Sequence, residues 1–156
     1  MTVMIGPMGL NAALGIGVEK QAVCKADIDL YRVTGKVLIT LIIGECVADA
    51  DHGSTDIKLN EKAGTLNLCA LSVCDFDNIG AMYVVTGDPV AVLNGNDAHV
   101  LHVAGHASAN PHQPIFFDGQ AGLTIELTQV GADATLEVLW TLFYIPLEPG
   151  ANVVAL

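Results

Sequence analysis

The stretch LYRVTGKVLITLII, residues 30–43, indicates the fold class of this chain. It is rich in β-branched and aromatic residues, which favour strands over helices. Its apolar positions follow a period of two, and the predicted inward set is Val33, Val37, Ile39 and Leu41. The opposite face mixes polar residues with Leu38 and Ile42, which is typical of a sheet covered on both sides near one end.

The C-terminal part shows the clearest alternation. GLTIELTQV, residues 122–130, and TLEVLWTLFYI, residues 135–145, are predicted strands separated by turn residues 131–133. In the first strand Leu123, Ile125 and Leu127 are predicted to point inward. In the second strand Leu136, Val138, Trp140 and Leu142 share one face.

Shorter strand candidates fill the middle of the chain, with Asn94-Gly95 as a type I′ hairpin signal. They span residues 56–60, 64–73, 80–86, 91–97, 99–104 and 113–117, the last ending at a turn at Asp118-Gly119. Many short strands with regular turn signals predict an all-β protein, an antiparallel β-sandwich of the jelly-roll type. An immunoglobulin-like sandwich is the alternative, but Trp140 follows all four cysteines, so the Cys-Trp-Cys order is missing.

The first 26 residues form a separate region with no charge before Glu19. A weak helix over residues 11–25 would contain Gly15 and Gly17, each of which costs about 1 kcal/mol in a helix interior. We therefore predict that residues 1–26 form an N-terminal arm that gains order on a partner, and that residues 27–156 form the β-sandwich domain. The alternative is an N-terminal strand of the same domain.

Composition limits the classes of function. The 156 residues are 52% hydrophobic and 15% charged, with a net charge of −11, so phosphate-driven nucleic-acid binding is not expected. No apolar run reaches the ~20 residues of a membrane-spanning helix, and no export signal is present, so we expect a protein made in the cytoplasm. So few charges predict that part of the surface is covered in a homo-oligomer or a larger assembly. The alternative is a monomer covered in Ser, Thr, Asn and Gly.

Charge is distributed unevenly along the chain. All six Lys and Arg residues lie in the first 62 residues, and every Asp, Glu, Lys or Arg after them is acidic. If these parts occupy different faces, one face is able to dock while the other faces solvent; alternatively, the fold mixes them.

The cysteines and histidines do not predict a metal centre. Cys24, Cys46, Cys69 and Cys74 contain no C-x-x-C pair, so reduced, mostly buried thiols are expected. The other candidate ligands are the histidines His52, His99, His102, His106 and His112. On a strand His99 points opposite to His102 and His106, and the cupin-type H-x-H pair followed by Glu is absent. One metal-binding arrangement stays open, in which a single histidine from each copy is repeated around an oligomer axis.

Asp75, Asp77 and Asn78 are similar to part of a calcium loop. Ile79 and Thr86 occupy positions five and twelve, where an EF-hand loop needs an acidic or amide ligand and a Glu. We therefore predict an Asp- and Asn-rich turn rather than a cation site.

No catalytic motif is present. The chain lacks G-x-S-x-G, a P-loop and G-x-G-x-x-G, so neither catalytic residues nor a cofactor are predicted. Two enzyme classes stay open as minor alternatives: paired carboxylates that converge in space, as in glycoside hydrolases, and a metal-dependent enzyme.

Two segments carry a family resemblance. LYRVTGKVLITLIIGE, residues 30–45, and LWTLFYIPLEPGANVV, residues 139–154, resemble small structural proteins of tailed bacteriophage virions. The resemblance implies a capsid decoration (cement) protein: a homo-oligomer, expected to be a trimer, on the capsid exterior, with the major capsid protein as partner. It carries no catalytic signature. The arm, or the apolar tail Ala151–Leu156, would bridge neighbouring capsid subunits.

The alternative function is a head-fibre or tail-associated jelly-roll module that binds a host glycan. Tyr83, Phe116 and Phe117 would then be exposed and line a shallow site.

Overall fold

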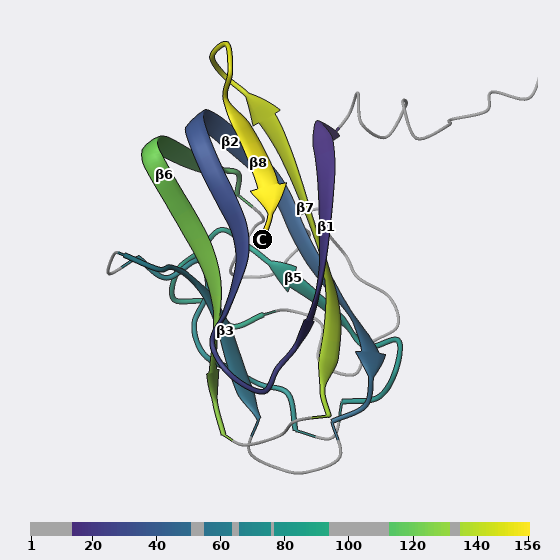
Figure 1. The fold of residues 1–156 in the computed structure, drawn as a ribbon. Coiled ribbons are helices and arrows are strands. Elements are labelled where there is room, and N and C mark those ends of the chain that lie inside the picture. Colours follow the sequence, from purple (N-terminus) through teal and green to yellow (C-terminus); the bar gives the residue numbers. More distant parts are fainter. Residues whose placement is uncertain (1–13, 51–54, 64–65, 76, 94–112, 132–134) are drawn as a thin grey trace, which may run out of the picture.

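The structure is a computed structural model that describes residues 14–50, 55–63, 66–75, 77–93, 113–131 and 135–156. All regular elements in this part of the chain are strands (Figure 1). They are β1 (Ile16–Val23), β2 (Ile28–Ala48), β3 (Asp56–Glu61), β4 (Ser72–Val73), β5 (Met82–Val85), β6 (Ile115–Val130), β7 (Glu137–Pro146) and β8 (Asn152–Ala155). The chain is therefore all-β, as predicted.

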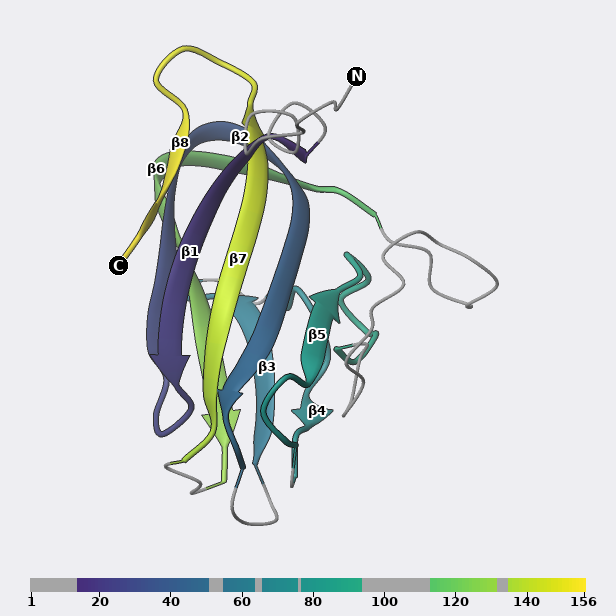
Figure 2. The same ribbon diagram turned by 90° about the vertical axis from the view of Figure 1, so that its right-hand side faces the viewer.

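Strand β2 connects two layers. Its first half pairs with β6 and β8, whereas its second half pairs with β7 and β5, and every pairing is antiparallel. The first layer consists of β1, β7, the second half of β2, and β5. The second layer consists of β8, the first half of β2, β6, β3 and β4. Figure 2 shows the curled sheet folding over so that the layers face each other, which is a jelly-roll-like sandwich.

The core between the layers confirms most of the predicted inward positions. Ile125, Leu127, Leu136, Val138, Trp140 and Leu142 are all fully buried. Leu123 is partly buried and packs against this core. Tyr31 donates a hydrogen bond from its hydroxyl to the Trp140 carbonyl at 2.9 Å, which ties the two layers together.

A bulge in β2 reverses the predicted face of Leu41. Ile39 lies opposite Tyr144 but Leu41 lies opposite Phe143, so Thr40 is an extra residue in the ladder. Because one inserted residue shifts the alternation, Leu41 packs with Val84 and Phe143 in a small outer cluster. The prediction that it shares a face with Ile39 is wrong. Leu41 is nonetheless buried, as expected for a sheet covered on both sides near one end.

Strand β6 replaces two predicted strands, so the predicted turn at Asp118-Gly119 is wrong. Val33 lies opposite Leu123 and Gly35 lies opposite Gly119, so the strand continues through an irregular stretch. Gly122 has a φ of 79° there, and a Cβ on Gly119 would lie 2.5 Å from the Val33 carbonyl oxygen. Glycine lets β6 stay paired here, because another residue would have a strained backbone at position 122 and would clash at position 119.

Both ends of the described chain are strands. β1 pairs with β7 along its whole length, so the alternative of an N-terminal strand holds for residues 16–23, and no helix forms over them. Residues 1–13 lie outside the described residues. Asn152 to Ala155 pair with β2 as strand β8, so this part of the apolar tail belongs to the sheet, and its bridging role stays a prediction.

The middle of the chain has less strand than predicted. Of the predicted strand over residues 64–73, the described residues 66–73 form a strand only at Ser72–Val73, besides an isolated bridge between Asn60 and Asn67. Residues 91–93 form no strand, and the predicted Asn94-Gly95 hairpin and strand 99–104 lie outside the described residues. No helix in the described part is long and apolar enough to cross a membrane.

The tight packing around Gly44 yields a test of the core. A Cβ there would lie 2.8 Å from Val138 Cγ1 and 2.9 Å from Trp140 Cζ3. We expect Gly44→Ala to lower the free energy of unfolding by about 1–3 kcal/mol, measured by urea denaturation, because the core is overpacked. Gly17→Ala is the control, since its Cβ would meet only the Phe143 ring, at 3.1 Å. Equal stability of Gly44→Ala and the parent would contradict this packing.

Candidate functional site

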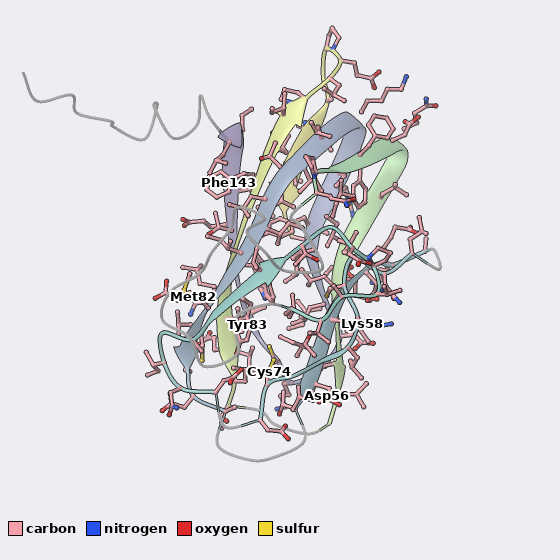
Figure 3. All side chains as sticks on the ribbon, turned by 180° about the vertical axis from the view of Figure 1, so that it is seen from behind. Asp56, Lys58, Cys74, Met82, Tyr83 and Phe143 are labelled. Carbon is pink, nitrogen blue, oxygen red and sulfur yellow. The ribbon has the colours of Figure 1, made fainter. Side chains whose placement is uncertain are left out.

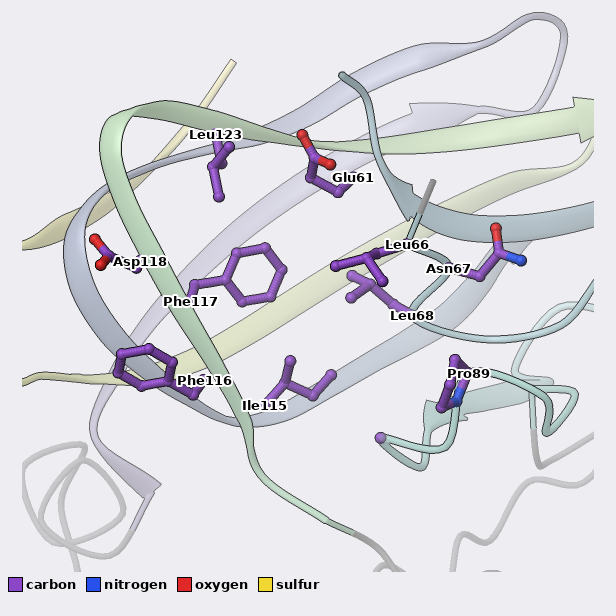
Figure 4. A pocket seen from close by; sticks show the side chains of 11 residues that line it. Glu61, Leu66, Asn67, Leu68, Pro89, Ile115, Phe116, Phe117, Asp118 and Leu123 are labelled. Carbon is purple, nitrogen blue, oxygen red and sulfur yellow. The ribbon is translucent and has the colours of Figure 1, made fainter. Parts of the chain in front are cut away.

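The described surface contains an apolar groove beside the start of β6, which we call the β6 groove (Figure 4). Its volume is about 330 Å³, within the range of small binding pockets. The apolar lining residues are Leu66, Leu68, Pro89, Ile115, Phe116, Phe117 and Leu123. Figure 4 shows Phe117, Leu66 and Ile115 pointing toward one another across the groove.

The groove lies where the second layer is incomplete. β3 pairs with β6 only from Ile125 to Val130, whereas β2 pairs with β6 from Ile115 to Leu127. The edge of β6 from residue 115 to 123 therefore has no partner strand within the described part of the chain. Residues 66–68 and Pro89 form the facing wall. The groove thus combines apolar side chains with one edge of a strand.

The polar side chains that line the groove are two carboxylates and one amide. Glu61 is 8% exposed, and its Oε1 accepts a hydrogen bond from the Ala63 amide at 3.1 Å. Asp118 is exposed, and Asn67 completes the polar lining. None of the described lining residues is basic. The groove therefore suits an uncharged or cationic occupant rather than an anion.

Two of the three aromatic residues that were expected to be exposed in a glycan site are buried. Tyr83 is buried and stacks on Trp140 with ring centroids 6.2 Å apart, and Phe117 is also buried. Phe116 is the exposed one, at 57%. Neighbouring residues of a strand point to opposite faces, so Phe116 and Phe117 do not form a flat aromatic platform.

Tyr83 instead belongs to a buried polar cluster between the layers. Its hydroxyl donates to Asp77 Oδ2 at 2.6 Å, and Asp77 is 2% exposed. Burial raises the pKa of Tyr83, and Cys74 beside it contributes to the rise, so the phenol stays protonated (Figure 3). This cluster anchors the loop before β5, and nothing in it resembles a reactive centre.

The Asp75–Asn78 segment acts as a turn. Asp75 Oδ1 accepts a hydrogen bond from the Thr55 amide at 2.7 Å, and Asp77 is engaged by Tyr83. The two carboxylates thus hold different parts of the chain, which supports the turn interpretation. No group of three or more metal-ligating residues forms among the described residues. The histidines, including His99, His102, His106, His112 and His52, lie outside them.

The four cysteines are buried thiols and none forms a disulfide, as expected. Burial raises the pKa of Cys46 and of Cys69 to about 11, and it raises the pKa of Cys74 further. A thiol that stays protonated is a poor nucleophile and a poor metal ligand. These cysteines are therefore packing residues.

A strip of exposed aliphatic side chains follows the β4 edge of the sheet, and sequence reasoning missed it. We call it the β4 strip, and its members, 39–80% exposed, are Leu71, Val73, Val90 and Val92. Two hydrogen bonds hold its two segments together, from the Ala70 amide to the Ala91 carbonyl at 2.7 Å and from the Leu93 amide to Ser72 Oγ at 2.6 Å. Residues 90–93, VAVL, are apolar throughout, so the sequence carried no signal that Val90 and Val92 would be exposed.

The two outer faces differ in charge. The register places Glu19, Glu45 and Glu137 on the outer face of the first layer, where the described strands carry no basic residue. The second layer carries Arg32, Lys36 and Lys58, with Lys62 just beyond the end of β3. Lys62 pairs with Asp29 at 2.6 Å and Lys36 pairs with Glu148 at 3.8 Å. Four of the six basic residues thus lie on or beside the second layer, mixed with acids, whereas Lys20 belongs to β1 of the first layer.

Comparison with known proteins adds no relative: no family model, no curated protein and no solved structure matches this chain.

The Tyr83–Asp77 hydrogen bond yields a test of the buried cluster. Tyr83→Phe removes a donor from a buried carboxylate, so we expect the free energy of unfolding to fall by about 1.5–3 kcal/mol. Tyr31→Phe is the matched control, because its main acceptor is a neutral carbonyl and a loss of about 0.5–1.5 kcal/mol is expected. Urea denaturation of both variants measures the difference. A smaller loss of unfolding free energy for Tyr83→Phe than for Tyr31→Phe would show that the charged acceptor does not make the Tyr83 hydrogen bond the stronger of the two.

The raised thiol pKa values predict a pH dependence. The unfolded protein loses thiol protons near pH 9, whereas folded Cys46 and Cys69 keep theirs until about pH 11. We therefore expect the free energy of unfolding to fall as pH rises from about 9 to about 11.

At pH 8 a thiol reagent such as Ellman's should react with none of the four cysteines until denaturant is added. Rapid labelling of the native protein would refute their burial.

Proposed function

We propose that this protein is a non-enzymatic structural component of a bacteriophage virion, a capsid decoration protein that acts as a homo-oligomer, expected to be a trimer. Its partners are copies of itself and the major capsid protein, and its location is the capsid exterior. The family resemblance of residues 30–45 and 139–154 suggests the class.

The observation that carries the proposal is the β4 strip. Val73 and Val90 are 61% and 80% exposed; Val73 lies in β4 at the edge of the sheet, and Val90 lies in a turn next to Ala91, whose carbonyl accepts a hydrogen bond from the Ala70 amide. A cluster of exposed aliphatic side chains on an acidic chain with 15% charged residues is typical of a surface that a partner covers.

The mechanism is additive binding. Each copy that bridges two capsid subunits favours the closed shell, because it binds only when those subunits are correctly placed. Many copies repeat this contribution over the shell without any chemical step. An acidic outer face, such as the one that carries Glu19, Glu45 and Glu137, would also repel DNA and other polyanions.

The glycan-binding alternative stays a prediction that now depends on Phe116, since Tyr83 and Phe117 are buried. A glycan array with purified protein tests it, together with the copy number per virion. A head-fibre or tail module would bind a defined glycan and be present at low copy number, whereas a decoration protein would be present at high copy number.

The β4 strip also yields the test of oligomerisation. We expect the isolated protein to have about three times the chain mass of 16.3 kDa in size-exclusion chromatography with light scattering. A Val73→Asp, Val90→Asp double variant should shift the population toward single chains, because two carboxylates would be buried without partners. Ile79→Asp is the control, since Ile79 is 59% exposed and lies outside the strip. A concentrated solution of single wild-type chains would contradict the proposal.

A further inference from the structure

We propose that the β6 groove receives the N-terminal segment of a second copy of this chain, which adds as an extra strand to the edge of β6 that has no described partner strand. This inference rests on the homo-oligomer proposed above and names one contact within it. It adds a defined docking site that is separate from the β4 strip.

The first reason is the edge of β6. In an antiparallel pair every second residue directs its amide and carbonyl away from the partner strand. Between residues 115 and 123, β6 is paired with β2 on one side and with no described strand on the other. Such an edge is the template for strand addition, in which main-chain hydrogen bonds provide affinity and side-chain pockets provide specificity.

The second reason is the lining of the groove beside this edge. Ile115, Phe117 and Leu66 offer apolar contacts, and Phe116 stands exposed at the rim. The nearby charges, Glu61 and Asp118, are both negative. An incoming strand must therefore be apolar and free of acidic residues.

The third reason is that the segment 1–13 matches these requirements. It contains no charged side chain, and Thr2, Val3 and Ile5 are β-branched residues that favour strands. Gly6-Pro7 follows, and proline cannot donate to a ladder, so the strand would end there. The candidate strand at residues 2–5 is about as long as the β6 segment that lines the groove.

The fourth reason is reach. The structure holds residue 14 in place, since Thr40 donates a hydrogen bond to the Leu14 carbonyl and Leu14 packs against the cluster that contains Phe143. Thirteen extended residues span up to about 45 Å, which is enough to leave one copy and enter the groove of its neighbour.

Site-specific disulfide cross-linking of the full chain tests the inference. Two tagged forms are coexpressed, one with Phe116→Cys and the other with Val3→Cys, Met4→Cys or Ile5→Cys, and a mild oxidant is added. The four native thiols are buried, so they leave the background low. We expect interchain dimers with an alternating yield, either high at 3 and 5 and low at 4 or the reverse, because strand side chains alternate. Ile79→Cys in place of Phe116→Cys is the control and should give none.

Three outcomes would overturn the inference. Equal yields at residues 3, 4 and 5 would exclude a strand. If the cross-link forms only within a single chain that carries both cysteines, the N-terminal segment occupies the β6 groove of its own chain. An oligomer without any cross-link would leave the groove to another occupant, such as a capsid-protein segment or a glycan. Light scattering on the same samples separates these results from failure of the proposed function, which would show single wild-type chains.

Discussion

Strand β2 belongs to both layers of the sandwich, and the rest of the structure depends on that double membership. Its 21 residues pair with β6 and β8 at one end and with β7 and β5 at the other. A strand that serves two layers must bend, and the extra residue at Thr40 provides the irregularity. The hydrogen bond from the Tyr31 hydroxyl to the Trp140 carbonyl then joins the layers across the buried core.

The functional surfaces follow from this arrangement. β2 pairs with a longer part of β6 than β3 does. Part of the other edge of β6 therefore has no described partner, and the β6 groove lies there. At the far end of the same layer, β4 is only two residues long, and the β4 strip extends the sheet edge with exposed aliphatic side chains. Both features present apolar surface at sheet edges, which supports a protein that works by association.

Much of the architecture was predictable, whereas the candidate sites were mostly not. Alternation in residues 122–130 and 135–145 identified inward residues such as Trp140, because side chains on a strand change face at every step. The same rule failed for Leu41, since one inserted residue reverses all later faces. Tyr83 looked like a surface aromatic residue, but Asp77 satisfies its hydroxyl inside the core. The β6 groove depends on where distant strands end, which local patterning does not record.

The sequence by itself determined the all-β class, the apolar faces of the main strands and the buried state of the cysteines. These properties follow from residue composition and period-two spacing, which act locally. Only the tertiary structure decided that residues 115–130 form one strand, that β1 and β8 belong to the sheet, and which strand edges have no described partner. Those outcomes depend on pairing between residues far apart in the chain, where backbone hydrogen bonds and core packing select one register among many.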